Sequence, residues 1–315
     1  MAILVTGGAG YIGRWLAREL LSMGIEPVAF DRLAPDPASK LPLPPQVEFL
    51  AGDVTDRDAV TAATKRRAFS AVIHLAGVVT MGCERDPELG MRVNLGGTHN
   101  VLEAARLAGI PKVVFASTIS VYGPDVPQPI TESVAIEPMT WYGQSKLMAE
   151  QLGLYYQRRY GIDFRAARLA AIVGPFRVAA GSATLYTTLI LERAALGEPY
   201  IIEVDERAAT PICYAKDAAR ALAALATVET APRRIYNIGT CRATSAGLLE
   251  LAKKKYPEAR IEFQADPAMA EVGRLSENWE LSTEAAADDL SWRPAYSLET
   301  MAEDLMATSR GERPV

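Results

Sequence analysis

The sequence predicts an α/β protein built on a doubly wound parallel sheet, with a smaller C-terminal α/β lid. Short apolar segments alternate with amphipathic helical segments in the first half of the chain. A glycine-rich turn directly follows the first apolar segment, and the regular alternation ends after Leu169. With 315 residues, of which 49% are hydrophobic, the chain can bury one large core or two smaller ones.

The first half of the chain is expected to supply six parallel strands, because apolar segments of strand length are separated by segments with helical periodicity. The expected strands are residues 3–6, 27–31, 47–51, 71–75, 112–116 and 163–169. The expected helices are residues 11–23, 56–67, 94–108 and 144–160. We therefore expect residues 1–170 to form the main domain.

The second half is expected to form mainly the lid, residues 171–315, while residues 215–240 return to the main domain. The expected strands are 200–204, 211–214, 234–238 and 260–264, and the expected helices are 185–196, 217–227, 246–255 and 298–307. Open α/β sheets bind ligands beyond the carboxyl ends of their strands, so we expect the lid to close over that edge and to bind the substrate.

Composition argues against several classes of partner and site. The net charge of -5 gives no general attraction to nucleic acid or to anionic lipid, and no apolar segment approaches the length of a membrane span. The chain opens on a strand-like segment without a charged leader, which favours a cytoplasmic protein. Its three cysteines have no close pairs and fit reduced thiols. With only two histidines, we expect no metal site.

The turn after the first strand has the sequence TGGAGYIG, residues 6–13, and leads into the first helix. Glycines at 7, 10 and 13 allow a tight turn, close approach of backbone to a pyrophosphate, and close packing of helix on strand. The free N–H groups of the helix N-terminus then face the phosphates. A glycine-rich turn can also serve simple chain reversal. However, Asp31 ends the next strand at the spacing of a carboxylate that binds ribose, which favours a dinucleotide site.

Asp31 also bears on which dinucleotide is bound. A carboxylate at this place accepts hydrogen bonds from a 2′-hydroxyl and repels a 2′-phosphate, so NAD is favoured over NADP. Arg32 is a counter-signal, because a guanidinium can pair with that phosphate, although it can equally be a solvated surface residue. Asp53 and Val54 follow the third strand where an adenine ring could be held; Asp53 could instead cap the next helix.

Tyr142 and Lys146 are four residues apart on a predicted helix, so both project from one face. An adjacent ammonium and a nicotinamide cation would both favour the phenolate, which could then take a proton from an alcohol as hydride leaves. The same spacing is common on ordinary helices. The glycine turn upstream and the hydroxyl-rich strand end at Ser117 and Thr118 favour the catalytic interpretation.

Together these residues resemble the extended short-chain dehydrogenase/reductases, also called the NAD-dependent epimerase/dehydratase family. The resemblance covers nearly the whole chain and rests on the motifs TGGAGYIG at 6–13, GDVTD at 52–56, HLAG at 74–77, VNLGGT at 93–98, STISVYG at 117–123, YGQSK at 142–146 and IVGP at 172–175. It implies a Rossmann fold and NAD as the cofactor.

The resemblance also implies roles for individual residues. Tyr142 is the implied general acid/base, Lys146 lowers its pKa and binds ribose, and Thr118 replaces the usual catalytic serine, with Ser117 as the alternative. Asn94 would tie its helix to neighbouring backbone on the active-site side. The implied cofactor contacts are Gly7, Gly10, Tyr11, Ile12, Gly13, Asp31, Arg32, Asp53, Val54, Leu75, Ala76, Gly77, Asn94, Tyr142 and Lys146.

Departures from the family pattern bear on the substrate. Nucleotide-sugar members usually carry an asparagine and an arginine that reach the diphosphate, and residues 168–171 and 209–214 have neither at those places. The lid is instead similar to that of short-chain-type L-threonine 3-dehydrogenases at 117–123, 180–182, 210–214 with Asp217, and 279–282. Thr184 stands where those enzymes carry an acidic residue, so this similarity does not fix threonine as the substrate.

We therefore expect an enzyme that transfers hydride between NAD and a small polar secondary alcohol, such as a hydroxy acid, an amino acid or a sugar derivative. The alternatives are a UDP-sugar 4-epimerase with tightly bound NAD and a non-catalytic NAD-binding regulator; an intact Tyr142 argues against the regulator. An arginine in the pocket would favour a carboxylate substrate, and Arg85, Arg177 and Arg274 are candidates. The candidate substrate contacts are Ser117, Thr118, Cys83, Ser182 and Arg177. The family also implies a homodimer joined through the helices at 94–108 and 144–160.

Overall fold

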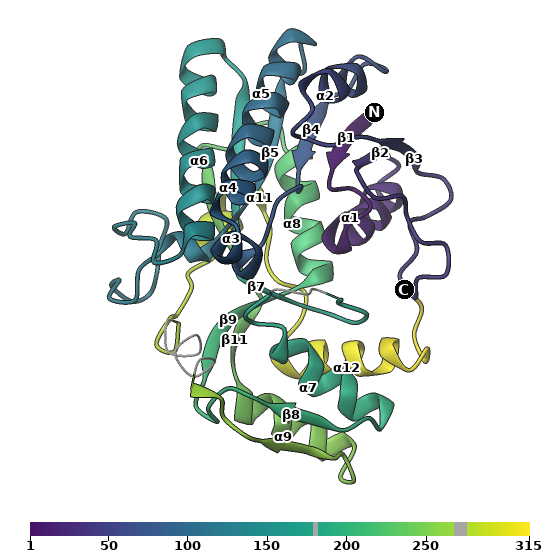
Figure 1. The fold of residues 1–315 in the computed structure, drawn as a ribbon, viewed down its shortest axis with the longest axis vertical. Helices are drawn as coiled ribbons and strands as arrows, with labels where there is room; N and C mark the ends of the chain where they lie inside the picture. The colour runs from purple at the N-terminus through teal and green to yellow at the C-terminus, as the bar shows by residue number, and fades with distance from the viewer. Residues whose placement is uncertain (179–181, 268–275) are drawn as a thin grey trace.

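The computed structural model describes residues 1–178, 182–267 and 276–315. Its main sheet contains β1 (Ala2–Thr6), β2 (Glu26–Asp31), β3 (Glu48–Ala51), β4 (Ala71–His74), β5 (Lys112–Thr118), β6 (Asp163–Leu169) and β10 (Ile235–Ile238). All seven strands are parallel, in the order β10-β6-β5-β4-β1-β2-β3 (Figure 1). This is the doubly wound sheet that the sequence predicts. The six strands expected in the first half are present, and β5 continues two residues further than expected, to Thr118.

Helices cover both faces of this sheet (Figure 1). The helices are α1 (Tyr11–Ser22), α2 (Arg57–Thr64), α5 (Thr98–Leu107), α6 (Trp141–Tyr160), α8 (Ala215–Thr227) and α11 (Glu284–Leu290). Ile3 and Val5 of β1 belong to a core shared with α1, α8 and α11, whereas Leu4 belongs to a second core shared with α2, α5 and α6. Successive side chains of a strand point to opposite faces, so one continuous apolar strand supplies both cores.

The lid lies below the sheet in Figure 1 and has a core of its own. It contains β7 (Ala171–Val173), β8 (Tyr200–Ile202), β9 (Ala209–Tyr214), β11 (Cys241–Thr244), β12 (Ile261–Phe263), α7 (Tyr186–Leu196), α9 (Ser245–Lys255) and α12 (Leu298–Ser309). Strands β11, β9 and β7 form one small sheet, and β12 and β8 form another. In the core of the lid, Ile190 and Leu191 of α7 pack with Leu248 of α9 and Met301 of α12.

Several short elements differ from the sequence expectation. The expected helix at 94–108 begins as a π-helix, Met91–Gly97, and is preceded by α3 (Thr80–Arg85) and α4 (Pro87–Gly90). The strands β7 and β11 and the helix α11 were not expected, because such short segments carry little periodicity. Among the described residues, no helix is long and apolar enough to cross a membrane.

The strand order reverses between β1 and its neighbour β4, which is where open α/β sheets place their ligands. The chain leaves β1 through the glycine turn toward β2, and it leaves β4 through Leu75, Ala76 and Gly77 toward the other half of the sheet. The two loops meet, because a Cβ placed on Gly7 would lie 2.7 Å from the Ala76 nitrogen. The fold thus brings Gly7 and Ala76, which are 69 positions apart in the sequence, to one edge of the sheet.

Candidate active site

A cavity of about 1010 Å³ opens at this edge, between the main sheet and the lid. Its volume is at the upper end of the range of about 300–1,000 Å³ for small-molecule pockets, which fits a dinucleotide together with a small second molecule. It is lined by most of the site residues predicted from the sequence, namely Gly7, Gly10, Tyr11, Ile12, Gly13, Asp31, Arg32, Asp53, Val54, Leu75, Ala76, Gly77, Ser117, Thr118, Tyr142, Lys146, Arg177 and Ser182.

The glycine turn has the shape that a pyrophosphate needs. Gly7 has a φ of +68°, a conformation that L side chains rarely adopt, and its N–H donates to the Phe30 carbonyl at 2.9 Å. A Cβ on Gly13 would lie 2.5 Å from the Gly8 oxygen, so no larger residue fits at the start of α1. The backbone of the glycine turn therefore leaves space for a phosphate beside the unpaired N–H groups of the first turn of α1.

Asp31 lies beside the glycine turn and lines the cavity. Its carboxylate accepts the N–H of Ala9 at 3.1 Å and that of Leu33 at 3.3 Å, which fixes it beside the glycine turn. Asp53 also lines the cavity. The cap of the next helix is Asp56, which accepts the N–H groups of Asp58 and Ala59. The alternative reading of Asp53 as the helix cap is therefore wrong, because its carboxylate instead closes a local turn with Thr55.

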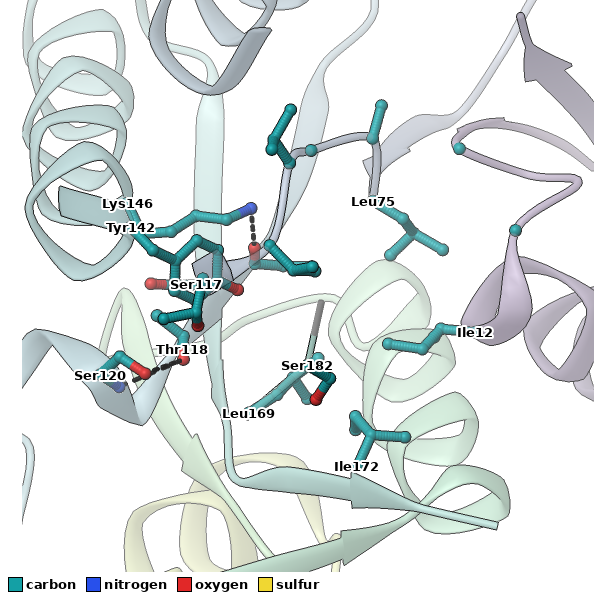
Figure 2. Close-up of a pocket in the computed structure, with 18 of the residues that line it drawn as sticks. Ile12, Leu75, Ser117, Thr118, Ser120, Tyr142, Lys146, Leu169, Ile172 and Ser182 are labelled. Atoms are coloured by element: carbon teal, nitrogen blue, oxygen red, sulfur yellow. Dashed lines mark hydrogen bonds between the residues drawn. The ribbon is translucent and has the colours of Figure 1, made fainter. Parts of the chain in front are cut away.

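Tyr142 and Lys146 project from one face of α6 toward the end of β5, as Figure 2 shows. Helix α6 begins three residues earlier than expected, at Trp141, because the Thr140 side chain caps it by accepting the Gly143 N–H at 3.0 Å. The Lys146 ammonium lies 5.9 Å from the centroid of the Tyr142 ring and donates to the Ala116 carbonyl at 2.9 Å. The Thr118 hydroxyl lies near enough to the phenol of Tyr142 to lower its pKa, and it donates to the Ser120 hydroxyl at 3.1 Å.

The protein by itself does not lower the pKa of Tyr142. Removal of water by burial raises this pKa to about 12, and the hydrogen bond from Thr118 and the charge of Arg177 offset only part of that effect. Burial also lowers the pKa of Lys146 to about 8. Lys146 is not among the groups that lower this pKa, and its ammonium is directed at the Ala116 carbonyl. A further positive charge next to the phenol is needed to favour the phenolate.

The structure distinguishes the two candidate hydroxyls at the end of β5. Ser117 lines the cavity, but its hydroxyl donates to the buried carboxylate of Glu150 at 2.5 Å. Glu150 in turn forms a two-point ion pair with Arg168. Thr118 is the hydroxyl that lowers the pKa of Tyr142, and it accepts the Ser120 N–H at 3.1 Å (Figure 2). This arrangement favours Thr118 over Ser117, because neighbouring residues of a strand face opposite sides.

Two predicted contacts lie behind the cavity wall instead of in the cavity. Cys83 is fully buried, and its thiol hydrogen bonds to the Val78 carbonyl at 3.3 Å. The Asn94 side chain binds both the N–H and the carbonyl of Val78, at 2.8 and 3.0 Å, and the Ser145 hydroxyl at 2.9 Å. The expectation of direct cofactor contact by Asn94 and direct substrate contact by Cys83 is therefore wrong. Asn94 holds the loop after β4 against α6.

Sequence reasoning missed Glu84, which lies in α3 and lines the cavity. Its carboxylate accepts the Trp141 N–H at 2.7 Å and the Tyr142 N–H at 3.4 Å, so it helps to fix the first turn of α6. No local pattern signals this contact, because the residues are 57 and 58 positions apart.

The structure places only some of the remaining candidate substrate residues in the cavity. Arg177 and Ser182 line the cavity, whereas Arg85 does not. Arg274 and residues 180 and 181 lie outside the described residues.

Comparison with known proteins gives the same result as this geometry. The family model described as NAD dependent epimerase/dehydratase matches residues 3–239. The chain belongs to the NAD-dependent epimerase/dehydratase family. It is a Rossmann-fold enzyme of the extended short-chain dehydrogenase/reductase type, and NAD is its cofactor.

Three relatives illustrate the range of this family. D-erythronate dehydrogenase of Cupriavidus necator is 34% identical over 279 residues, which cover 81% of this chain and 82% of the relative. Mitochondrial L-threonine 3-dehydrogenase of Bos taurus is 27% identical over 315 residues, covering 96% of this chain and 81% of the bovine protein. The structure of UDP-glucose 4-epimerase of Thermus thermophilus in complex with NAD has a TM-score of 0.86 and 30% identity, over 99% of both chains.

Proposed function

We propose that the protein is an NAD-dependent dehydrogenase of a small polar secondary alcohol: a hydroxy acid, an amino acid or a sugar derivative. The observation that carries the proposal is the meeting of Tyr142, Thr118 and Lys146 in the cavity that the glycine turn also lines. Two relatives named as dehydrogenases of D-erythronate and L-threonine support it.

In this proposal four residues of the site have distinct roles. NAD, when bound, supplies the acceptor for hydride, and its positive charge stabilises the phenolate that burial of Tyr142 disfavours. Tyr142 takes the proton from the substrate hydroxyl, and Thr118 hydrogen bonds to the same oxygen and orients it. Lys146, anchored on the Ala116 carbonyl, is placed to bind the nicotinamide ribose. Asp31 binds the hydroxyls of the adenosine ribose.

A UDP-sugar 4-epimerase with tightly bound NAD is the second candidate, and the fold of the Thermus thermophilus enzyme favours it. The substrate end of the cavity argues against it. Ala170, which lines the cavity, offers no side-chain donor to a diphosphate, and Arg168 is engaged by Glu150. Arg207 does not line the cavity, and its side chain is 83% exposed. Arg177 is then left to balance a diphosphate, whose charge exceeds that of one guanidinium.

The experiment is NADH formation measured by absorbance with a panel of polyols, hydroxy acids, threonine and UDP-sugars. Net NADH from a small alcohol supports the dehydrogenase. Interconversion of a UDP-sugar without net NADH supports the epimerase, and no turnover of any class despite NAD binding supports a regulator. The Tyr142→Phe variant is expected to lose about 10²–10⁴-fold in turnover and to keep NAD binding, because the ring and its packing remain. Retention of more than about a tenth of the rate contradicts the proposed proton transfer.

We also propose the chain's domain division, assembly and location. The proposed division is an NAD-binding domain of residues 1–170 with 215–240, and a lid formed mainly by residues 171–315. A homodimer joined through α5 and α6 would cover Leu107, Tyr155 and Tyr160, which are exposed. The free cysteines fit a reducing cytoplasm. Light scattering of the purified protein and fractionation of the source cells test these two assignments.

A further inference from the structure

Arg177 is a cation in the cavity that lacks a carboxylate partner in the described part of the chain. It follows β7 at the entrance to the lid and is partly buried. Its guanidinium donates to the Ile172 carbonyl at 2.6 Å and to the Ser182 hydroxyl at 2.8 Å. None of the carboxylates in residues 1–178, 182–267 and 276–315 forms an ion pair with it.

This environment is unfavourable for a cation that is always charged. Burial lowers the pKa of Arg177, and the nearby groups that partly offset this effect are the phenols of Tyr11 and Tyr142, which are neutral at physiological pH. An arginine has five N–H donors in a planar fork, and the two contacts above occupy only some of them. A partly buried cation without a counter-charge favours an anion that brings the missing charge with it.

The surroundings of Arg177 also fit the shape of a small anion. Ser182 and Thr184 line the same part of the cavity, and their hydroxyl oxygens are 3.4 Å apart. Figure 2 shows Ser182 beside Leu169 and Ile172, across the opening from the helix that carries Tyr142 and Lys146. Arg177, Ser182 and Thr184 therefore line one region of the cavity, and both hydroxyls can donate to an anionic oxygen.

The positive charge of Arg177 acts on Tyr142, because it lowers the pKa of the phenol. An alcohol oriented by Tyr142 and Thr118 thus lies in the same cavity as a fixed cation. One molecule can contact Tyr142 and Arg177 together if it carries a secondary hydroxyl and an anionic group on the same short carbon chain.

We propose that Arg177 is the group that selects the substrate, and that the substrate is a short-chain hydroxy acid whose carboxylate binds this guanidinium. The inference rests on the proposed dehydrogenase function and deepens it. A carboxylate is favoured over a phosphate ester because Arg177 is one cation, which balances one negative charge, whereas a phosphate carries almost two. Lys146 is directed at the Ala116 carbonyl and does not add a second charge at this end.

The test compares matched pairs of compounds in wild type and in the Arg177→Met variant. Each pair is an acid and an analogue that lacks the carboxylate charge, such as D-erythronate with erythritol, and L-threonine with its amide. The expected result is a loss of about 100-fold or more in kcat/KM for the acid, because removal of one partner of a desolvated charge pair is costly. The analogue without the carboxylate is expected to lose much less, because it loses only the effect of the Arg177 charge on the pKa of Tyr142. Equal losses for the two members of a pair, or no loss for the acid, overturn the proposal.

Three further variants show whether the loss of activity on the acid is caused by removal of the Arg177 guanidinium. Arg177→Lys keeps the charge without the fork and is expected to lose less than Arg177→Met. Ser182→Ala removes one partner of Arg177 and is expected to weaken the acid selectively. Arg207→Met is the matched control, because Arg207 is exposed and does not line the cavity. If Arg207→Met reduces activity on the acid as strongly as Arg177→Met, selection by Arg177 is contradicted.

A binding experiment separates this inference from the proposed function. Isothermal titration of NADH-loaded protein with D-erythronate, with erythritol and with inorganic phosphate needs no turnover. If D-erythronate binds to the wild type and not to Arg177→Met, the result supports the anion site even when no alcohol is oxidised. In that case only the proposed dehydrogenase function is contradicted. Binding of phosphate as tight as that of the carboxylate, or equal binding of erythritol, contradicts a carboxylate site.

Discussion

Glu150 and Arg168 form a fully buried ion pair directly behind the end of β5. The guanidinium of Arg168 contacts the Glu150 carboxylate through two nitrogens, at 3.0 and 2.7 Å. The same carboxylate accepts the Ser117 hydroxyl, and Arg168 also donates to the Tyr122 phenol at 2.9 Å. This network fixes the backbone that presents Thr118 to Tyr142.

Loss of one partner of this pair is expected to destabilise the protein strongly. Glu150→Gln leaves Arg168 buried and charged without its counter-ion, so we expect the free energy of unfolding to fall by about 3–5 kcal/mol. Chemical denaturation measures the change. Arg66→Met breaks the pair with Glu48 at a side chain that is 61% exposed, and it is expected to cost no more than about 1 kcal/mol. Similar losses of unfolding free energy in the two variants would show that the buried ion pair contributes no more to stability than the exposed one.

The rate of alcohol oxidation is expected to increase with pH. Oxidation needs the phenolate of Tyr142, and its pKa of about 12 in the protein by itself lies above neutral pH, so each unit below the working pKa reduces the active fraction tenfold. We expect log kcat/KM for oxidation to rise with unit slope, and to level off below pH 12 because the charge of bound NAD favours the phenolate. Reduction needs the protonated phenol and provides the internal control. Parallel profiles in the two directions contradict the assignment.

Cofactor preference is expected to depend on Asp31. Asp31→Ser removes the charge that repels a 2′-phosphate while keeping a hydrogen-bonding group, so the ratio of kcat/KM for NADP over NAD should increase at least tenfold. The measurement is steady-state kinetics with each cofactor at a fixed alcohol concentration. Arg32→Ala is the neighbouring control and is expected to leave the use of NAD nearly unchanged. An unchanged ratio in Asp31→Ser would mean that the carboxylate does not face the ribose.

Stability is expected to decrease in acid because of His74. This histidine is buried between the hydroxyls of Thr6 and Thr98, and burial lowers its pKa from 6.5 to about 3. Between these two pH values the unfolded chain binds a proton that the folded protein does not, so folding loses about 1.4 kcal/mol per pH unit as the pH falls below 6.5.

Denaturation curves at several pH values between 3 and 6.5 measure this contribution as a difference between variants. His74→Asn is expected to lose the His74 part of the slope. His99→Asn is the matched control, because His99 is exposed and its replacement should leave the slope intact. If the slopes of His74→Asn and wild type coincide, the buried neutral histidine is not the cause.

Much of the fold and of the dinucleotide site could be predicted from the sequence. Strand and helix periods are local, and the glycine turn, Asp31 and the four-residue spacing of Tyr142 and Lys146 are each defined within one or two elements. The start of α6 was misplaced because its cap, Thr140, belongs to a loop, and the short strands β7 and β11 carry too little pattern to be recognised.

The sequence by itself determined the sheet, the dinucleotide turn and the Tyr–Lys pair, because near neighbours along the chain set their geometry. Only the tertiary structure decided which hydroxyl faces the phenol, placed Asn94 and Cys83 behind the wall, and brought Arg177 into the cavity while Arg207 remained exposed. Those outcomes depend on strand register and on packing between the lid and the sheet. No local spacing encodes them, because each side chain's direction is set by partners far away in the chain.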